Sequence, residues 1–368
     1  MTKNISLFKS YLTVDSPTYQ GGKTRSEINF DGPIHKLSSN ENPLGPSPLA
    51  VEAIQKHLLG LNEYPDRTDV RLRNKLSEFY NHQLTADQFF TANSGVGVIE
   101  LIVHAFLGEG MECICSNPAF LPYISFPKKV GAVIKDIPLV GDSFELDVEG
   151  IINAITDKTR VIWLCSPNNP TGTYLPKNDI DKLLAQVPDH VVVVLDEVYF
   201  QFATAEDYTT ALPYVLAGKN VIGVNSFSKA YGLAGLRVGY AYATPTIARY
   251  ISKLQRPFYI NTLALEACMA ALSDHNFLEK TIQMVNDGKS FLYAEYEKLG
   301  IKYWKSQANF ITVKPQMNDK IFEQRMLEQG VMVRPVATFG HPDCIRITIG
   351  TPKANRAVIQ AMKKLINE

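Results

Sequence analysis

A series of short, mainly apolar runs, most of them followed directly by polar residues, constrains the fold of this chain most strongly. The runs comprise residues 112–115, 132–139, 160–165, 191–195 and 221–224. The run at 191–195 contains four valines and a leucine without a polar residue between them. Such continuous β-branched runs are typical of strands that are buried on both faces. Helical segments between the runs complete the pattern, which predicts an α/β fold with a mostly parallel central sheet sandwiched by helices.

The pattern changes after Pro245, and the 368 residues are long enough for two domains. Helices are predicted at 246–272, 276–298, 319–329 and 353–366, and strands at 308–313, 331–334 and 345–349. We therefore predict a large domain over 37–245. A smaller α+β domain is expected to combine an N-terminal arm, 1–36, with residues 246–368.

Three polar side chains follow three separate apolar runs. Asn169 comes after 160–165, Asp196 directly follows 191–195, and Lys229 comes shortly after 221–224. Ligands of open α/β sheets bind outside the carboxyl ends of the strands. The sequence therefore predicts that an amide, a carboxylate and an amine lie around one cleft.

The surroundings of Lys229 indicate a Schiff-base lysine. Hydroxyl and small residues flank it, and Arg237 follows in a glycine-rich context that suits an anion. A carboxylate such as Asp196 can keep a pyridine nitrogen protonated, while Tyr199 and Asn169 can donate to a ring oxygen. Taken singly, Asp196 could be a helix cap, Asn169 a turn residue and Arg237 half of a surface ion pair. Together they predict a site for pyridoxal phosphate.

A glycine turn at 94–97 opens an apolar helix at 98–106. Backbone N–H groups at such a helix start are free to hold a phosphate, although the same residues could form a plain tight turn. The turn is not a dinucleotide-binding fingerprint, because Glu100 stands where the third glycine belongs.

Three motifs carry a resemblance to a known family. They are Ser-Pro-Asn-Asn-Pro-Thr-Gly at 166–172, Asp-Glu-Val-Tyr at 196–199 and the lysine–arginine stretch at 226–239. The chain resembles the class I/II, fold-type I aminotransferases, and within them the histidinol-phosphate aminotransferase group. The resemblance extends from about Tyr19 to the C-terminus.

This resemblance implies pyridoxal 5'-phosphate as the cofactor, with Lys229, Asp196 and Tyr199 as catalytic residues. The cofactor-binding residues that it implies are Tyr64, Gly95, Val96, Phe120, Asn169, Asp196, Tyr199, Ser226, Ser228, Lys229 and Arg237. Phe120 takes the place of an aromatic residue, often tyrosine, that stacks on the cofactor ring. Tyr64 resembles a residue that reaches the cofactor phosphate of a neighbouring subunit, which implies a homodimer with shared active sites.

The family binds the anionic group of its substrate with arginines, and Arg334 and Arg346 match them. Tyr19 and Asn42 resemble residues that close over the ligand and line the entrance. The resemblance thus implies transamination between histidinol phosphate and 2-oxoglutarate in histidine biosynthesis. However, the family usually has an acidic pair in the phosphate-binding turn, where this chain has Ser94-Gly95-Val96-Gly97. An aromatic amino acid aminotransferase therefore remains an alternative, as does a decarboxylase of phosphorylated amino acids.

Composition argues against other classes of partner. Lysine plus arginine and aspartate plus glutamate number 37 each, so the balance predicts neither nucleic acid nor an anionic membrane. The seven histidines form no His-x-x-x-His pair, so no metal site is expected. A transcriptional regulator would need a helix-turn-helix domain, for which there is no signal. Five cysteines in mainly apolar segments and the lack of a secretion signal predict a cytoplasmic protein.

Overall fold

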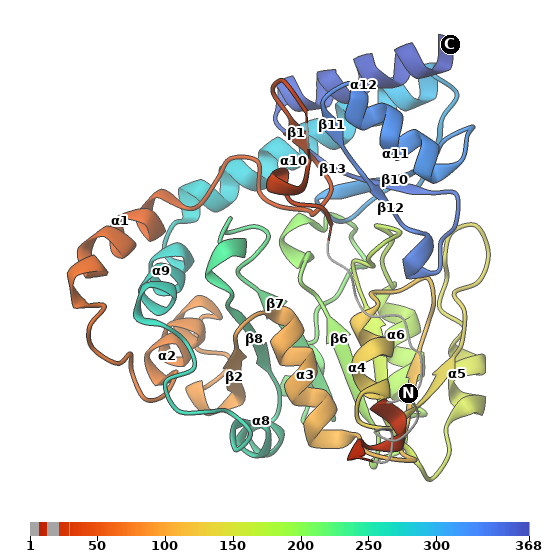
Figure 1. The fold of residues 1–368 in the computed structure, drawn as a ribbon. Helices are drawn as coiled ribbons and strands as arrows, with labels where there is room; N and C mark the ends of the chain where they lie inside the picture. Colours follow the sequence, from red (N-terminus) through yellow and green to blue (C-terminus); the bar gives the residue numbers. More distant parts are fainter. Residues whose placement is uncertain (1–6, 13–21, 29, 368) are drawn as a thin grey trace.

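A computed structural model of the protein describes residues 7–12, 22–28 and 30–367. The ribbon has a larger and a smaller part (Figure 1), and buried apolar side chains form a core in each. The larger one surrounds a seven-stranded sheet with the order β2-β8-β7-β6-β5-β3-β4. Strand β8 is antiparallel to both of its neighbours, β2 and β7, and every other adjacent pair in this sheet is parallel. In chain order the strands are β2 Phe89–Ala92, β3 Glu112–Cys115, β4 Val133–Asp136, β5 Thr159–Cys165, β6 Val192–Asp196, β7 Val221–Ser226 and β8 Gly239–Tyr242. The predicted mostly parallel α/β sheet is confirmed.

Helices cover both faces of this sheet. They are α1 Pro48–His57, α2 Val70–Phe79, α3 Gly95–Phe106, α4 Pro122–Lys128, α5 Val148–Ala154, α6 Lys177–Leu184, α7 Leu212–Leu216, α8 Pro245–Ser252 and α9 Thr262–Leu272. One face is packed against α3, α4 and α8, which contribute Val98, Tyr123 and Ile251 to a common cluster. The other helices, α2 and α9 among them, share a second cluster with the opposite face. Because both faces are covered, the strands read as continuous apolar runs.

The smaller core belongs to an antiparallel sheet with the order β12-β13-β10-β9. Its elements are α10 His275–Lys298, β9 Lys302–Tyr303, β10 Phe310–Lys314, α11 Asp319–Glu328, β11 Val331–Met332, β12 Arg334–Pro335, β13 Ile345–Thr348 and α12 Pro352–Asn367. Near the N-terminus, β1 (His35–Lys36) pairs in parallel with β11. Short 3-10 helices lie at Ser10–Leu12, Arg25–Glu27, Leu58–Gly60, Ala86–Gln88, Phe200–Phe202, Ala234–Leu236 and Ala337–Phe339.

The division between the two cores differs from the predicted boundary at Pro245. The sequence pattern predicts that residues 246–272 belong to the smaller domain, but α9 buries Leu265 and Cys268 in the large core. The smaller core begins within α10, with Val285 and Leu292. The change of pattern after Pro245 reflects the last helices that cover the parallel sheet, so it does not mark a new domain.

None of the helices that the structure describes combines the length and the apolar character needed to cross a membrane.

Candidate active site

A cavity of about 420 Å³ lies where the two domains meet at the carboxyl edge of the large sheet. The large domain contributes Lys229, Asp196 and Asn169, and the small domain contributes Arg334 and Arg346. The three strand ends that the sequence singled out therefore do surround one space. Adjacent parallel strands bring them together, since β5 pairs with β6 and β6 with β7.

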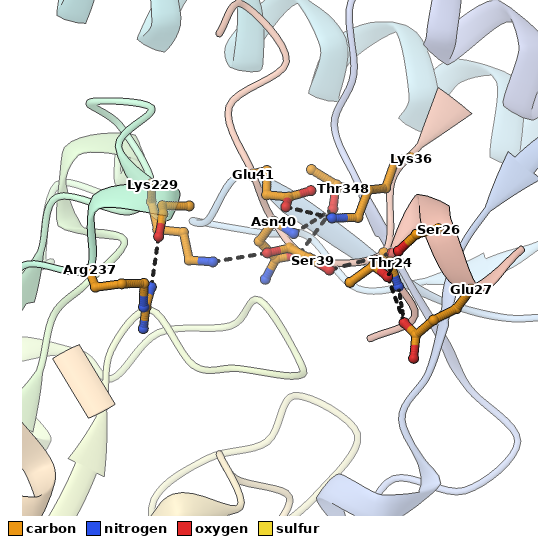
Figure 2. A network of polar contacts seen from close by, with 12 residues as sticks. Thr24, Ser26, Glu27, Lys36, Ser39, Asn40, Glu41, Lys229, Arg237 and Thr348 are labelled. Atoms are coloured by element: carbon orange, nitrogen blue, oxygen red, sulfur yellow. Dashed lines mark hydrogen bonds and ion pairs between the residues drawn. The ribbon is translucent and has the colours of Figure 1, made fainter. Parts of the chain in front are cut away.

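Lys229 reaches this cavity from the loop after β7, and its Nζ donates a hydrogen bond of 3.0 Å to the backbone oxygen of Ser39 (Figure 2). The pKa of this amine is lowered to about 7, chiefly by desolvation and in part by the positive charges of Arg346 and Arg237. The carboxylate of Glu41 opposes them. At neutral pH a large fraction of Lys229 is thus the free amine, which is the nucleophilic form.

Asp196 is the last residue of β6 and is 5 % exposed. Its Oδ2 accepts a hydrogen bond of 2.6 Å from the hydroxyl of Tyr123, and its Oδ1 accepts one of 3.2 Å from the backbone N–H of Val198. Burial raises the pKa of the carboxyl to about 6, although these donors and Lys229 favour the charged form. A buried carboxylate held in this way suits a cationic ring nitrogen as its partner.

The two predicted donors to a ring oxygen are both held by other residues. Nη1 of Arg346 donates to Oδ1 of Asn169 at 2.6 Å, so the amide nitrogen of Asn169 stays available as a donor. The hydroxyl of Tyr199 accepts a hydrogen bond of 3.0 Å from Nδ2 of Asn40. Burial raises the pKa of the Tyr199 hydroxyl, which keeps its proton available for donation.

The other end of the cavity gathers groups that suit a phosphate. Gly95 and Val96 begin α3, and Ser226, Ser228 and Arg237 line the same space. The Oγ of Ser226 donates to the Oγ of Ser228 at 2.9 Å. At Gly239 a Cβ atom would lie 2.3 Å from the backbone nitrogen of Gly95, so only glycine permits this close approach of β8 to the turn. Free helix N–H groups, two hydroxyls and a guanidinium fit a dianionic phosphate.

Phe120 lines the cavity beside Phe339, and their rings are stacked with a centroid separation of 6.5 Å. The guanidinium carbons of Arg334 and Arg346 lie 5.8 and 5.6 Å from the centroid of the same Phe339 ring. The end of the cavity that these two arginines line is therefore both cationic and aromatic.

Two predicted residues lie away from this cavity. Asn42 is not among the lining residues, because its Nδ2 donates to the backbone oxygen of Ala230 and to the hydroxyl of Thr281. It fixes the loop to the large domain and to α10. Tyr64 is 84 % exposed and packs against Phe258, outside its own chain's cavity. Tyr19 lies outside the described residues.

Several lining residues were not predicted from the sequence. Tyr123 is the second residue of α4 and lies three positions after Phe120, and this closeness in the chain was the available signal. Asn40 and Glu41 line the cavity and belong to the same Asn-Glu-Asn-Pro segment as Asn42. The order of residues in this segment did not show which side chains face the cavity. Phe339 lies in a short 3-10 helix without a recognisable motif.

Comparisons with known proteins agree with this geometry. The family model of aminotransferase class I and II matches residues 33–362. The histidinol-phosphate aminotransferase of Akkermansia muciniphila is 39 % identical over 368 residues, covering 99 % of this chain and all of that protein. The enzyme of the same name from Geobacillus sp. is 38 % identical, with 96 % of each chain covered.

Solved structures share the fold. Histidinol-phosphate aminotransferase from Sinorhizobium meliloti, crystallised with pyridoxal-5'-phosphate, has a TM-score of 0.82 at 23 % identity, with 91 % of this chain and 92 % of that chain covered. The enzyme from Clostridium acetobutylicum also has a TM-score of 0.82, at 22 % identity, with 90 % and 99 % covered.

The chain belongs to the class I and II aminotransferases. It is a transaminase that depends on pyridoxal phosphate, and the predicted family and cofactor are confirmed. The part of the chain that the structure describes contains no cluster of histidine, cysteine, aspartate and glutamate that could hold a metal ion.

Proposed function

We propose that this protein transfers the amino group of histidinol phosphate to 2-oxoglutarate, in histidine biosynthesis. The observation that carries the proposal is the cationic end of the cavity, where Arg334 and Arg346 face the same aromatic ring. Guanidinium groups suit a phosphate in one half-reaction and a carboxylate in the other. The naming of the relatives at 38–39 % identity supports the same amino donor.

When bound, pyridoxal phosphate supplies an electrophilic aldehyde and a ring that absorbs the electron pair released at the substrate carbon. Lys229 is the group that would anchor the aldehyde and then move a proton at that carbon, since its pKa of about 7 lets the amine both accept and release one. Asp196 would hold the ring nitrogen in its protonated state. Tyr199 and Asn169 would donate to the ring oxygen.

The remaining cofactor residues would fix its position. Gly95 and Val96 would offer backbone N–H groups to the phosphate, and Ser226, Ser228 and Arg237 would complete the anion site. Phe120 would pack on the ring face as an aromatic without a hydroxyl. Because five donors would act on the phosphate and two on the ring oxygen, the reacting atoms would be held still.

We propose a homodimer as the active unit. Tyr64, with 84 % of its surface exposed, lies beside Phe258 among exposed leucines at 58, 59 and 61. A tyrosine exposed to this extent among apolar side chains suits burial against a second copy of the chain. There its hydroxyl would reach the phosphate site of the neighbouring subunit.

The dimer is tested by mixing two inactive variants, Lys229→Ala and Tyr64→Ala. Mixed dimers contain one site with both Lys229 and the other chain's Tyr64, so we expect activity to return when the two proteins are co-refolded. Failure of either variant to complement the other, with dimers present by sedimentation, would refute a shared site.

The amino donor is tested by steady-state kinetics with histidinol phosphate, histidinol, phenylalanine and tyrosine, each with 2-oxoglutarate. We expect the highest kcat/KM for histidinol phosphate and a loss of about 10- to 100-fold for histidinol, which lacks the phosphate. A higher kcat/KM for phenylalanine would favour the aromatic aminotransferase instead. Release of carbon dioxide without 2-oxoglutarate would favour the decarboxylase.

We place the protein in the cytoplasm. The five cysteines are free thiols, and Cys113, Cys115, Cys268 and Cys344 are buried. Buried thiols without disulfide bonds suit a reducing compartment.

A further inference from the structure

Asn40 is almost completely buried, at 1 % exposed, and lies between the two domains. Its Nδ2 donates to the hydroxyl of Tyr199 in the large domain at 3.0 Å. Its Oδ1 accepts a hydrogen bond of 3.2 Å from the hydroxyl of Thr348 on β13, in the small domain. The backbone is fixed as well, because its oxygen accepts from Nδ2 of Asn309 at 3.1 Å. Figure 2 shows Asn40 and Thr348 in the same network of polar contacts as Lys229, whose Nζ donates to the backbone oxygen of the adjacent Ser39.

Thr348 decides which way the amide of Asn40 points. The backbone N–H of Asn40 donates to the Thr348 hydroxyl oxygen at 2.9 Å. The proton of that hydroxyl then goes to an acceptor, and the Oδ1 of Asn40 is the acceptor within reach. The amide nitrogen must therefore face Tyr199, since the opposite orientation would bring two donors together at Thr348.

The same arrangement decides where the proton of Tyr199 points. A phenol has one proton to donate, and here its oxygen already accepts a hydrogen bond from Asn40. The proton is therefore directed away from Asn40, and Tyr199 is one of the residues that line the cavity. If the amide oxygen of Asn40 faced Tyr199 instead, it would accept the hydroxyl proton, and Tyr199 could not donate that proton into the cavity.

We propose that Asn40 is a positioning residue that directs the hydroxyl proton of Tyr199 into the cavity, toward the oxygen of the cofactor ring. Thr348, Asn40 and Tyr199 form a chain of donors that all point the same way, and each bond in such a chain strengthens the next. The small domain thereby controls how strongly Tyr199 donates. Asn40 also adopts the left-handed conformation, with φ at 55°, which asparagine tolerates better than most residues.

The test is a spectrophotometric pH titration of the coloured, cofactor-loaded protein, which reports the protonation of the nitrogen that joins Lys229 to the cofactor. Thr348→Val removes the hydroxyl without changing size or charge, and Asn40→Gly removes the amide while permitting the left-handed backbone. In both variants we expect the midpoint to rise by about half a unit to one unit, because a weaker donor stabilises the ring oxygen less. Thr348→Ser retains the hydroxyl and should keep the original midpoint.

A double-mutant comparison separates positioning from a general loss of structure. In a Tyr199→Phe background, Thr348→Val and Asn40→Gly should leave the midpoint where Tyr199→Phe alone puts it. The charged groups around Lys229 are the same in every variant: Lys36, Glu41, Asp196, Arg237 and Arg346. An unchanged midpoint in both single variants, or an equal shift with and without Tyr199, would overturn the proposal.

The inference rests on the part of the proposed function that concerns the cofactor, and it is independent of the amino donor. Protein that stays colourless with pyridoxal phosphate would refute the cofactor site as a whole. Coloured protein whose midpoint does not respond to Thr348→Val or Asn40→Gly would refute only the role of Asn40.

Discussion

The two sides of the cavity are built in different ways. On the cofactor side, Asn169, Asp196 and Lys229 follow three strands that are direct neighbours in one sheet. On the substrate side, Arg346 donates to the backbone oxygen of Ser38, which is 308 positions away in the chain. The residues proposed for the cofactor therefore come from local motifs at the ends of strands, whereas the arginines proposed for the substrate depend on how two domains and an N-terminal loop meet.

Lys229→Ala gives the sharpest test of the cofactor side. Since no other amine takes its place among the described lining residues, we expect kcat to fall roughly 10⁴-fold or more. Borohydride should trap the cofactor covalently on the native protein and not on the variant, which mass spectrometry would detect. A variant that kept both colour and turnover would remove the basis of the assignment.

Asp196→Asn should lower kcat by roughly 10²- to 10³-fold, because a neutral amide cannot stabilise a protonated ring nitrogen. Its neighbour Glu197 gives a matched control. Glu197 is completely buried and accepts hydrogen bonds from Tyr242, Asn225 and the backbone of Ala211, away from the cavity.

We expect Glu197→Gln to lower the free energy of unfolding by about 1–3 kcal/mol, since one of these donors would face an amide nitrogen. Kinetics and thermal unfolding of both variants check the contrast. Equal losses of activity in the two variants would contradict a specific role for Asp196.

Arg346→Gln tests the substrate side. We expect KM for both 2-oxoglutarate and the phosphorylated donor to rise about 10- to 100-fold, through loss of a charge-assisted hydrogen bond. The affinity for pyridoxal phosphate should change much less, and fluorescence titration of the cofactor-free protein measures it. A large loss of cofactor affinity with unchanged KM would place Arg346 on the cofactor side instead.

The smallest predicted effect is the gradual change with pH in the rate at which Lys229 captures the cofactor. Its amine is neutral above a pKa of about 7, so the rate of cofactor capture by cofactor-free protein should be constant at higher pH. Below that value the neutral fraction, and with it the rate, should fall about tenfold per pH unit. Stopped-flow absorbance checks this profile. A midpoint near the ordinary value of 10.5 would show that the amine is not desolvated as described.

Much of the fold followed from the sequence. Strands β5, β6 and β7 were predicted to within two residues, because burial on both faces leaves a continuous apolar signal. The predicted boundary at 245 precedes α8 and α9, which pack on the two faces of the large sheet, and the sequence pattern alone did not show this packing. Strand β8 was missed, since Gly239–Tyr242 is short and follows the lysine–arginine motif directly.

Asn40 and Asn42 show where sequence reasoning stopped. Both lie in one short segment, and both carry the same amide. The left-handed backbone at Asn40 turns that side chain toward Tyr199, whereas Asn42 faces Ala230 and Thr281. A choice of this kind depends on backbone dihedral angles and on partners from distant strands, which local composition does not encode.

By itself the sequence determined the parallel sheet, the lysine, carboxylate and amide at its edge, and hence the cofactor chemistry. The physical reason is that parallel strands carry the residues after their carboxyl ends to one place, whatever the loops between them do. Only the tertiary structure decided that Tyr123 holds Asp196, that Asn40 faces Tyr199 and that two arginines share one aromatic ring. The first two contacts join residues that are far apart in the chain, and the third depends on the pairing of β12 with β13 around the short helix between them, so local composition does not encode them.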